Sequence, residues 1–146
     1  MKVEVIIDEE YKETIIKIFA NSYSKDIENL EKSLNSINNN IFIGFDDEDV
    51  YIIAVKDIVR FYTENNDIII EDLKKSYKSR LRLYEIYSRL DKRNFIQISR
   101  SEIINISFIK KLDLSFKGTI AVELKNGETT YVSRRNLKEF KNLLGF

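Results

Sequence analysis

Residues 95–106 read Phe95-Ile96-Gln97-Ile98-Ser99-Arg100-Ser101-Glu102-Ile103-Ile104-Asn105-Ile106. A second stretch with a similar arrangement, residues 131–138, reads Tyr131-Val132-Ser133-Arg134-Arg135-Asn136-Leu137-Lys138. In both stretches an apolar run of strand-forming residues is followed by a hydroxyl side chain and an arginine. We therefore predict two strands, each of which presents a serine and an arginine at its end.

Short apolar and alternating runs predict further strands throughout residues 41–146. The predicted strands cover residues 41–45, 50–54, 58–63, 67–71, 76–80, 95–98, 102–106, 109–116, 119–125 and 128–133. Asn126-Gly127 predicts a hairpin with a type I′ turn, which needs positive φ at both central residues. Apolar residues at helical spacing predict a short helix over residues 82–90 and a last helix after Ser133. These elements predict a mainly β fold with short helices, of the α+β class and about ten short strands.

The first 40 residues are expected to form a small ββα unit. Residues 3–7 and 14–19 predict two strands, and residues 25–37 predict an amphipathic helix with Ser24 as its N-cap. A unit of about 40 residues is too small to be stable alone. We expect it either to cap the rest of the chain or to pack on a second copy, which would give a homodimer.

Charge is unevenly distributed, although the chain has no net charge. Residues 1–40 hold 5 Lys or Arg and 8 Asp or Glu (net −3), residues 41–72 hold 2 and 9 (net −7), and residues 73–146 hold 17 and 7 (net +10). A basic region attracts nucleic-acid phosphates without regard to sequence. The alternatives are a solvated basic surface and an anionic membrane, although no long basic amphipathic helix supports a membrane.

Missing residue types exclude many kinds of chemistry. The chain has no His and no Cys, which rules out a histidine base, histidine or thiolate metal ligands and disulfides. Its four glycines cannot build a P-loop or a dinucleotide-binding fingerprint. The acidic run at residues 46–49 lacks the glycine of a calcium loop and is interpreted as a solvated turn. We expect no enzyme activity, metal or cofactor, although a carboxylate-based enzyme stays open. No signal-peptide-like or membrane-spanning run is found, which predicts a cytoplasmic location.

The pairing of residues 95–106 with residues 131–138 resembles the LytTR family of DNA-binding domains, which regulate transcription in bacteria. The two motifs have the expected separation, with a predicted hairpin between them. The resemblance covers residues 41–146 and leaves out residues 1–40. It implies an elongated arrangement of small sheets whose loops, along one side, enter successive major grooves of double-stranded DNA.

The resemblance implies base contacts from three places. They are the turn Ser99–Ser101 with Arg100, the arginine Arg135, and the loop that holds Asn65 and Asn66. The planar fork of arginine matches guanine O6 and N7, and asparagine can match adenine N6 and N7. Members of the family often have a basic or imidazole side chain in that loop. Asn65 and Asn66 therefore either read A·T pairs or only form a hairpin turn.

Phosphate contacts are expected from hydroxyls and cations beside the base readers. The predicted phosphate-binding residues are Ser99, Ser101, Ser133, Arg134 and Lys138. Other interpretations compete, since Arg100 can instead pair with Glu102 or another acid, and Arg135 can be a surface charge near a helix N-terminus. The basic residues of the segment 74–82 either extend the phosphate footprint or form a solvated strand edge. Asn105 is expected to satisfy buried backbone groups.

Two functions are compatible with these patterns. The first is a sequence-specific DNA-binding transcriptional regulator that reads successive major grooves. The second is a protein-interaction or dimerisation module without specific DNA binding, with the acidic residues 46–72 as its interface. Residues 1–40 are too few for a phosphoacceptor receiver domain. Control is therefore expected from abundance, dimerisation or an unidentified regulatory protein partner.

Overall fold

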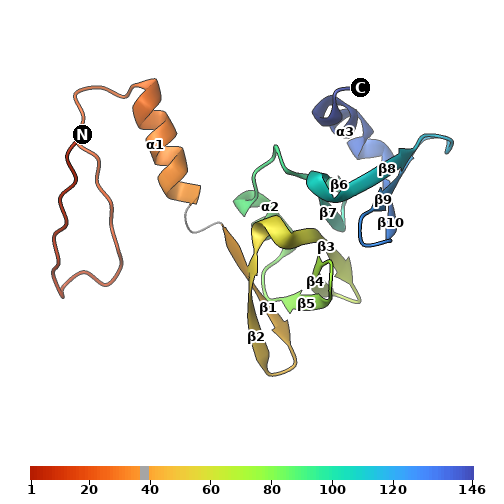
Figure 1. Cartoon of the computed structure of the whole chain (residues 1–146), viewed down its shortest axis with the longest axis horizontal. Coiled ribbons are helices and arrows are strands. Elements are labelled where there is room, and N and C mark those ends of the chain that lie inside the picture. The colour runs from red at the N-terminus through yellow and green to blue at the C-terminus, as the bar shows by residue number, and fades with distance from the viewer. Residues whose placement is uncertain (37–39) are drawn as a thin grey trace. The chain divides into compact units, whose positions relative to one another are not determined.

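The computed structural model describes residues 1–36 and 40–146 (Figure 1). The chain divides into two compact units, residues 1–34 and residues 35–146. Of the helices among the described residues, none has the length and apolar character needed to cross a membrane.

Helix α1 (Lys25–Ser36) forms where the helical periodicity predicts it. Ser24 is its N-cap, because Ser24 Oγ accepts a hydrogen bond from Ile27 N at 3.3 Å. The predicted last residue, 37, lies outside the described residues. The helix and its cap are therefore confirmed.

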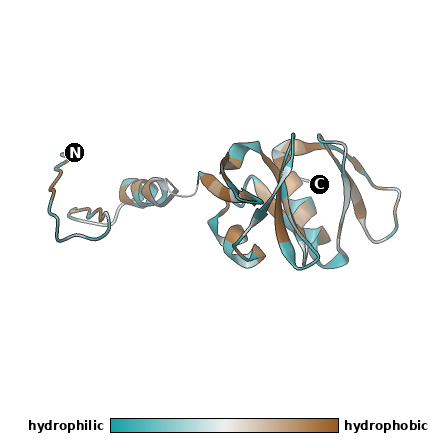
Figure 2. Cartoon of the chain, turned by 90° about the horizontal axis from the view of Figure 1, so that it is seen from below, coloured by the Kyte–Doolittle hydropathy of each residue, from teal (hydrophilic) through white to brown (hydrophobic). Residues whose placement is uncertain are grey.

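The two strands predicted over residues 3–7 and 14–19 are wrong, and with them the ββα arrangement. An alternating run becomes a strand only where a neighbouring strand takes up its backbone hydrogen bonds. Within residues 1–23, Tyr11 N donates to Asp8 O at 3.2 Å across a turn, and no ladder joins the two runs. Their apolar side chains stay exposed, so no other part of this unit buries the hydrophobic segments that are brown in Figure 2.

Residues 41–105 supply a seven-stranded sheet. Its strands are β1 (Ile41–Asp46), β2 (Asp49–Ala54), β3 (Ile58–Glu64), β4 (Asp67–Asp72), β5 (Ser76–Ser79), β6 (Phe95–Ser99) and β7 (Glu102–Asn105). Their order in the sheet is β2-β1-β5-β4-β3-β7-β6. Every pair of neighbours is antiparallel.

Residues 109–132 supply a second, three-stranded sheet with the order β10-β9-β8. Its strands are β8 (Ile109–Asp113), β9 (Ile120–Leu124) and β10 (Thr129–Val132). The described residues of this unit also form helices α2 (Leu83–Arg89) and α3 (Leu137–Leu144), with 3₁₀ turns at Val55–Asp57, Ile106–Phe108 and Arg134–Asn136. The predicted mainly β, α+β class is confirmed, because each strand predicted from residue 41 onward overlaps an observed strand.

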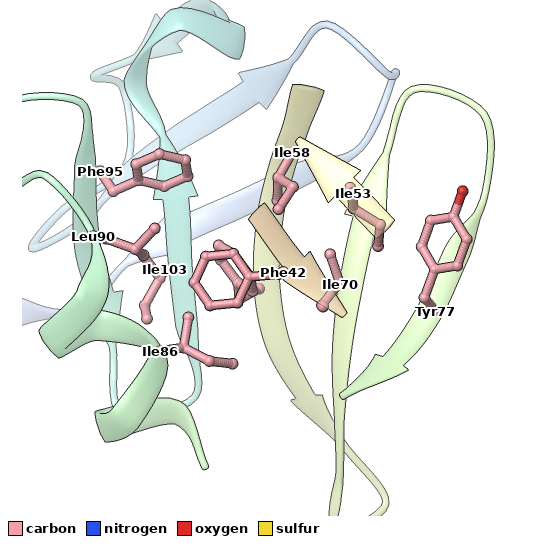
Figure 3. Close-up of a cluster of buried hydrophobic side chains, with 10 residues drawn as sticks. Phe42, Ile53, Ile58, Ile70, Tyr77, Ile86, Leu90, Phe95 and Ile103 are labelled. Atoms are coloured by element: carbon pink, nitrogen blue, oxygen red, sulfur yellow. The ribbon is translucent and has the colours of Figure 1, made fainter. Parts of the chain in front are cut away.

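Strands β3, β6 and β7 form the part of the sheet that has a hydrophobic cluster on each face. Phe95 and Ile103 belong to the first cluster, and the next residues, Ile96 and Ile104, belong to the second. The first cluster includes Ile86 of α2 (Figure 3), and the second includes side chains of the three-stranded sheet and of α3. Because both faces are buried, β6 and β7 are nearly continuous apolar runs rather than alternating ones.

The hairpin between β9 and β10 is confirmed, but the type I′ turn predicted at Asn126-Gly127 is wrong. Gly127 has φ +91°, whereas Asn126 is not among the residues with positive φ. Leu124 N donates to Glu128 O at 2.8 Å, which encloses a three-residue loop with glycine last, another common hairpin turn. The side chain of Asn126 accepts from Glu128 N at 3.1 Å and donates to Glu71 Oε1, and these bonds hold it in the longer loop.

The acidic run Asp46-Asp47-Glu48-Asp49 forms the turn between β1 and β2. Asp47 has φ +52°, and Asp46 pairs with Lys75 at 2.8 Å. Among the described residues, no group of three or more His, Cys, Asp or Glu is arranged to hold a metal ion.

Candidate nucleic-acid interface

The turn Ser99-Arg100-Ser101 connects β6 to β7. Ser99 pairs with Glu102 across the hairpin, so Arg100 and Ser101 are the two connecting residues. Ser101 N donates to Ser99 Oγ at 3.3 Å, and the two hydroxyl oxygens are 3.4 Å apart. A register shift between Gln97 and Ser99 increases the local twist of the hairpin. The two serines therefore brace the turn, and Arg100 is exposed at its tip.

The predicted alternative of an ion pair between Arg100 and Glu102 is wrong. Glu102 Oε2 accepts from Arg60 Nη1 at 3.4 Å, and Glu102 Oε1 accepts from Thr130 Oγ1 at 2.8 Å. Among the described residues the Arg100 guanidinium has neither an ion pair nor a hydrogen bond. Its charge is therefore available to a ligand.

Asn65 and Asn66 form the two-residue turn between β3 and β4. Both have positive φ, 50° and 67°, which is the signature of a type I′ hairpin. Thr63 N donates to Ser101 O at 2.9 Å, so this turn is tied to the turn that carries Arg100. The hairpin-turn interpretation explains why asparagine occurs at both positions, and both side chains are exposed. Base reading by these amides stays a prediction.

Arg135 lies in the 3₁₀ turn Arg134–Asn136, just before α3. Asn136 N donates to Ser133 O at 2.9 Å, and Asn136 Nδ2 donates to Ser133 Oγ at 2.6 Å. The hydroxyl proton of Ser133 is therefore left to donate to another group. Ser133 N donates to Ile98 O at 2.8 Å, which attaches this segment to β6. Arg135 is exposed.

Two backbone hydrogen bonds thus gather the three predicted base-reading segments. The turn Ser99–Ser101 is in the middle, with Asn65 and Asn66 joined to one side of it through Thr63 and Arg135 joined to the other through Ser133. Asn66 and Arg100 also line one open groove of about 690 Å³. Three segments that are distant in the sequence are therefore brought close together.

Arg134 extends from the same 3₁₀ turn toward the loop between β8 and β9. A Cβ placed on Gly118 would lie 3.0 Å from Arg134 Nε, so the guanidinium rests against this glycine. Gly118 has φ +73° and lies in the turn between β8 and β9. Arg134 and Lys138, in the first turn of α3, are both exposed. Phosphate binding by these two residues stays a prediction.

Asn105 is confirmed as an interior residue. It is 3% exposed, and its Nδ2 donates to Ile58 O at 2.9 Å. Its Oδ1 accepts from Ser107 N at 3.1 Å and from Ser107 Oγ at 2.8 Å. It therefore joins β7 to β3 and does not belong to the exposed surface.

Arg60 is a charged residue that sequence reasoning missed. It makes two hydrogen bonds with Glu71, at 3.0 Å and 3.2 Å, and lies 3.4 Å from Glu102 and 3.8 Å from Glu128. The side chains of Arg60 and Glu71 are each only 11% exposed. Arg60 and Glu71 are directly opposite each other in β3 and β4. An arginine and a glutamate in two neighbouring apolar runs are the signal that could have indicated this pair.

Burial also changes the chemistry of Glu102. Removal from water raises the pKa of this carboxyl above its ordinary value, and the Thr130 hydrogen bond and Arg60 oppose that shift only in part. Glu102 and Thr130 join β7 to β10, as Asn126 and Glu71 join the β9–β10 loop to β4. The network therefore stabilises the contact between the two sheets that position Arg100 and Arg135.

Comparisons with known proteins agree with this architecture. Residues 48–145 match the model of the LytTR family, described as the LytTr DNA-binding domain. A solved structure from Bacillus cereus, described as a LytTr DNA-binding domain, superposes with a TM-score of 0.70 and 21% identity, covering 73% of this chain and 98% of that chain. This likeness shows the fold.

Bacterial relatives match almost the whole chain. Proteins from Staphylococcus aureus strains NCTC 8325 / PS 47 and COL, each named an uncharacterised HTH-type transcriptional regulator, are 33% identical over 145 residues. The match covers 99% of this chain and 98% of each relative. With its fold, its two motifs and these matches taken together, the chain belongs to the LytTR family of DNA-binding domains.

Proposed function

We propose that this protein is a sequence-specific DNA-binding transcriptional regulator that reads successive major grooves with the turns at the ends of its strands. The observation that carries the proposal is the surface on which the turn Ser99–Ser101, the turn Asn65–Asn66 and the segment Ser133–Lys138 meet. Family membership and the names of the Staphylococcus aureus relatives support the same function.

Arg100 and Arg135 are the proposed readers of guanine. Both are exposed on short, hydrogen-bonded turns, and neither has a carboxylate partner among the described residues. A guanidinium without an internal partner can make two hydrogen bonds to guanine O6 and N7. The fixed turns limit the freedom that each side chain loses on binding. Asn65 and Asn66 are the proposed readers of adenine on the neighbouring turn.

Phosphate contacts would position these readers on the duplex. Ser99, Ser101 and Ser133 have hydroxyls close to the readers, and Arg134 and Lys138 add exposed cations. Hydroxyls and cations of this kind set the register of a protein on DNA without reading sequence.

The relatives are named as HTH-type regulators, but the described residues of this chain favour turns rather than a recognition helix. A helix-turn-helix motif needs two helices joined by a short turn. Here α2 ends at Arg89 and α3 begins at Leu137, and α1 ends at Ser36. No two helices of the described chain are consecutive in that sense, so the proposed reading elements are turns.

Selection of bound duplexes from a random DNA pool at about 0.15 M salt tests the proposal. We expect recovery of a repeated sequence motif with a fixed spacing. The variant Arg100→Ala/Arg135→Ala should recover no motif while it keeps its folded circular-dichroism spectrum. Binding without any motif, which disappears as salt rises, would refute sequence-specific reading by the wild-type chain.

A protein-interaction module without specific DNA binding is the competing function. It would use the acidic residues 46–72, among which the turn Asp46–Asp49 is exposed. The double arginine variant separates the two ideas, because it removes DNA binding under the first and leaves partner binding untouched under the second.

We also propose that the first unit joins two copies of the chain. Its strand-like runs have no ladder of their own, and Val5 (77%) and Phe19 (91%) are highly exposed. Pairing with the same runs of a second copy would bury these side chains and satisfy the backbone. Sedimentation of the full chain should give a dimer, and Val5→Asp/Phe19→Asp should give a monomer with an unchanged second unit. A wild-type monomer at every concentration would exclude this assembly.

A further inference from the structure

Three connections leave the seven-stranded sheet at the same end. Ile68 pairs with Ser79, so the segment after β5 emerges beside the turn of Asn65 and Asn66. Tyr62 pairs with Glu102, so the turn that carries Arg100 emerges there too. The segment Ser79–Arg82 is therefore a neighbour of two proposed base-reading turns.

The open groove of about 690 Å³ lies at this end of the sheet. Its lining includes three arginines, Arg80, Arg82 and Arg100, together with the amides of Asn66 and Gln97. Asp67 also lines it, but the Asp67 carboxylate pairs with Lys78 at 3.4 Å. The groove is therefore positively charged.

Arg80 and Arg82 have no ion pair among the described residues. The Arg80 guanidinium lies 3.9 Å from the centroid of the Phe45 ring, which limits its motion without neutralising its charge. Arg82 is exposed, and its backbone N donates to Glu85 Oε1 at 3.2 Å. Both cations are thus held near the groove with their charge available.

The basic residues of the segment 74–82 do not form one surface. Lys74 and Lys75 lie in the turn between β4 and β5, at the opposite end of these strands, where Lys75 pairs with Asp46 at 2.8 Å. Lys56, in the 3₁₀ turn before β3, lies at that opposite end as well. Only the later part of the segment faces the groove.

We infer that Arg80 and Arg82 each bind a backbone phosphate of the same DNA duplex whose bases Arg100 reads. The inference rests on the proposed function and adds a fourth segment, Ser79–Arg82, to the three that the motifs indicate. The planar guanidinium pairs with two phosphate oxygens. The DNA strand that crosses the groove would be held between the turn with Asn66 and the turn with Arg100.

The salt dependence of DNA binding tests this site. The variant Arg80→Gln/Arg82→Gln is compared with Lys56→Gln/Lys74→Gln, which removes the same charge at the opposite end of the sheet. Dissociation constants are measured between about 50 and about 200 mM salt, with the selected duplex and with a shuffled duplex. Loss of two phosphate contacts should lower the slope of log affinity against log salt by about 1.8, so the affinity change across this range shrinks roughly tenfold.

The outcomes separate the site from the proposed function. Equal weakening on both duplexes by the arginine variant, with a wild-type slope for the lysine variant, supports the site. If the wild type still selects a motif but the two variants show the same slope of log affinity against log salt, the site is wrong. The proposed function is then unaffected. A wild type that selects no motif removes the proposed function itself.

Two further measurements test whether the effect comes from each arginine and whether the ligand is a phosphate of the duplex. Arg82→Gln alone leaves the contact of Arg80 with Phe45 intact. If the site is correct, this single variant should show about half of the slope change that the double variant shows. Inorganic phosphate alone, added to the wild type, should perturb the Arg80 and Arg82 side-chain NMR signals much less than the duplex does. Saturation by inorganic phosphate at lower concentration than DNA would contradict a duplex phosphate as the ligand.

Discussion

Arg60 and Arg100 are the same residue type in two opposite settings. Arg60 lies where the two sheets meet, 11% exposed, with two hydrogen bonds to Glu71 and a contact with Glu102. Arg100 is exposed at the tip of a turn and has no carboxylate partner among the described residues. An arginine enclosed with carboxylates therefore stabilises the fold, whereas an arginine on a rigid turn without them is available for a ligand.

The largest effect is expected from Arg60→Met. This change leaves the buried carboxylates of Glu71 and Glu102 without their cation, which should lower the free energy of unfolding by about 3–5 kcal/mol. Urea denaturation measures it. The control Arg93→Met removes an arginine that is 88% exposed and pairs with Asp91, and should cost about 0–1 kcal/mol. Similar losses of unfolding free energy in the two variants would show that burial of Arg60 with its carboxylates adds no stability.

Arg135→Ala should act on binding and leave the fold intact. Loss of a base contact should weaken binding to the selected duplex by about 1–3 kcal/mol, roughly 5- to 150-fold, and relax specificity at one position. The free energy of unfolding should stay within about 0.5 kcal/mol of the wild type. The neighbouring variant Arg134→Ala should weaken all sequences alike. If instead Arg134→Ala relaxes specificity at one position and Arg135→Ala weakens all sequences alike, Arg134 is the residue that contacts the base.

Asn66→Gly tests the two interpretations of the β3–β4 turn. Glycine adopts positive φ readily, so the hairpin should keep its stability, unlike a change to a residue that resists φ 67°. We expect a loss of preference at one A·T position, smaller than the effect of Arg135→Ala because an amide contact carries no charge. Sequencing of duplexes selected by the variant measures it. An unchanged motif would reduce Asn66 to a turn residue.

The smallest effect concerns the pH dependence of stability. Burial raises the pKa of Glu102 in the folded state, so the folded state holds this proton more tightly than the unfolded state. The resulting stability is complete below the unfolded pKa of 4.5 and is lost as pH rises through the raised folded pKa. Glu102→Gln has no such proton, so its stability relative to the wild type should improve as pH rises. Urea denaturation from about pH 4 to pH 8 measures the difference, and a constant difference would contradict the role of burial.

Local patterns predict most of the second unit. Each strand predicted from residue 41 onward overlaps an observed strand, because an antiparallel neighbour lies directly before or after it in the chain and takes up its backbone hydrogen bonds. The same kind of pattern fails over residues 3–7 and 14–19, where no neighbour forms a ladder within the unit. Alternation predicts which residues can form a strand, and the presence of a partner decides whether they do.

The arrangement of the candidate site is only partly encoded in local patterns. The exposed arginines on turns follow from where the runs end, but their proximity depends on the hydrogen bonds of Thr63 and Ser133 to the β6–β7 hairpin. Likewise, the segment 74–82 looks like one basic cluster, yet its ends lie at opposite ends of β5. Both features depend on strand register, which composition and spacing do not specify.

The most direct test is a map of amide chemical shifts of the ¹⁵N-labelled full chain on addition of the selected duplex. We predict perturbations at Asn65–Asn66, Arg80–Arg82, Ser99–Ser101 and Ser133–Lys138, with little change at the acidic turn Asp46–Asp49 and at Arg60. Perturbations centred on Asp46–Asp49, with the arginine-bearing turns unchanged, would contradict the proposed interface.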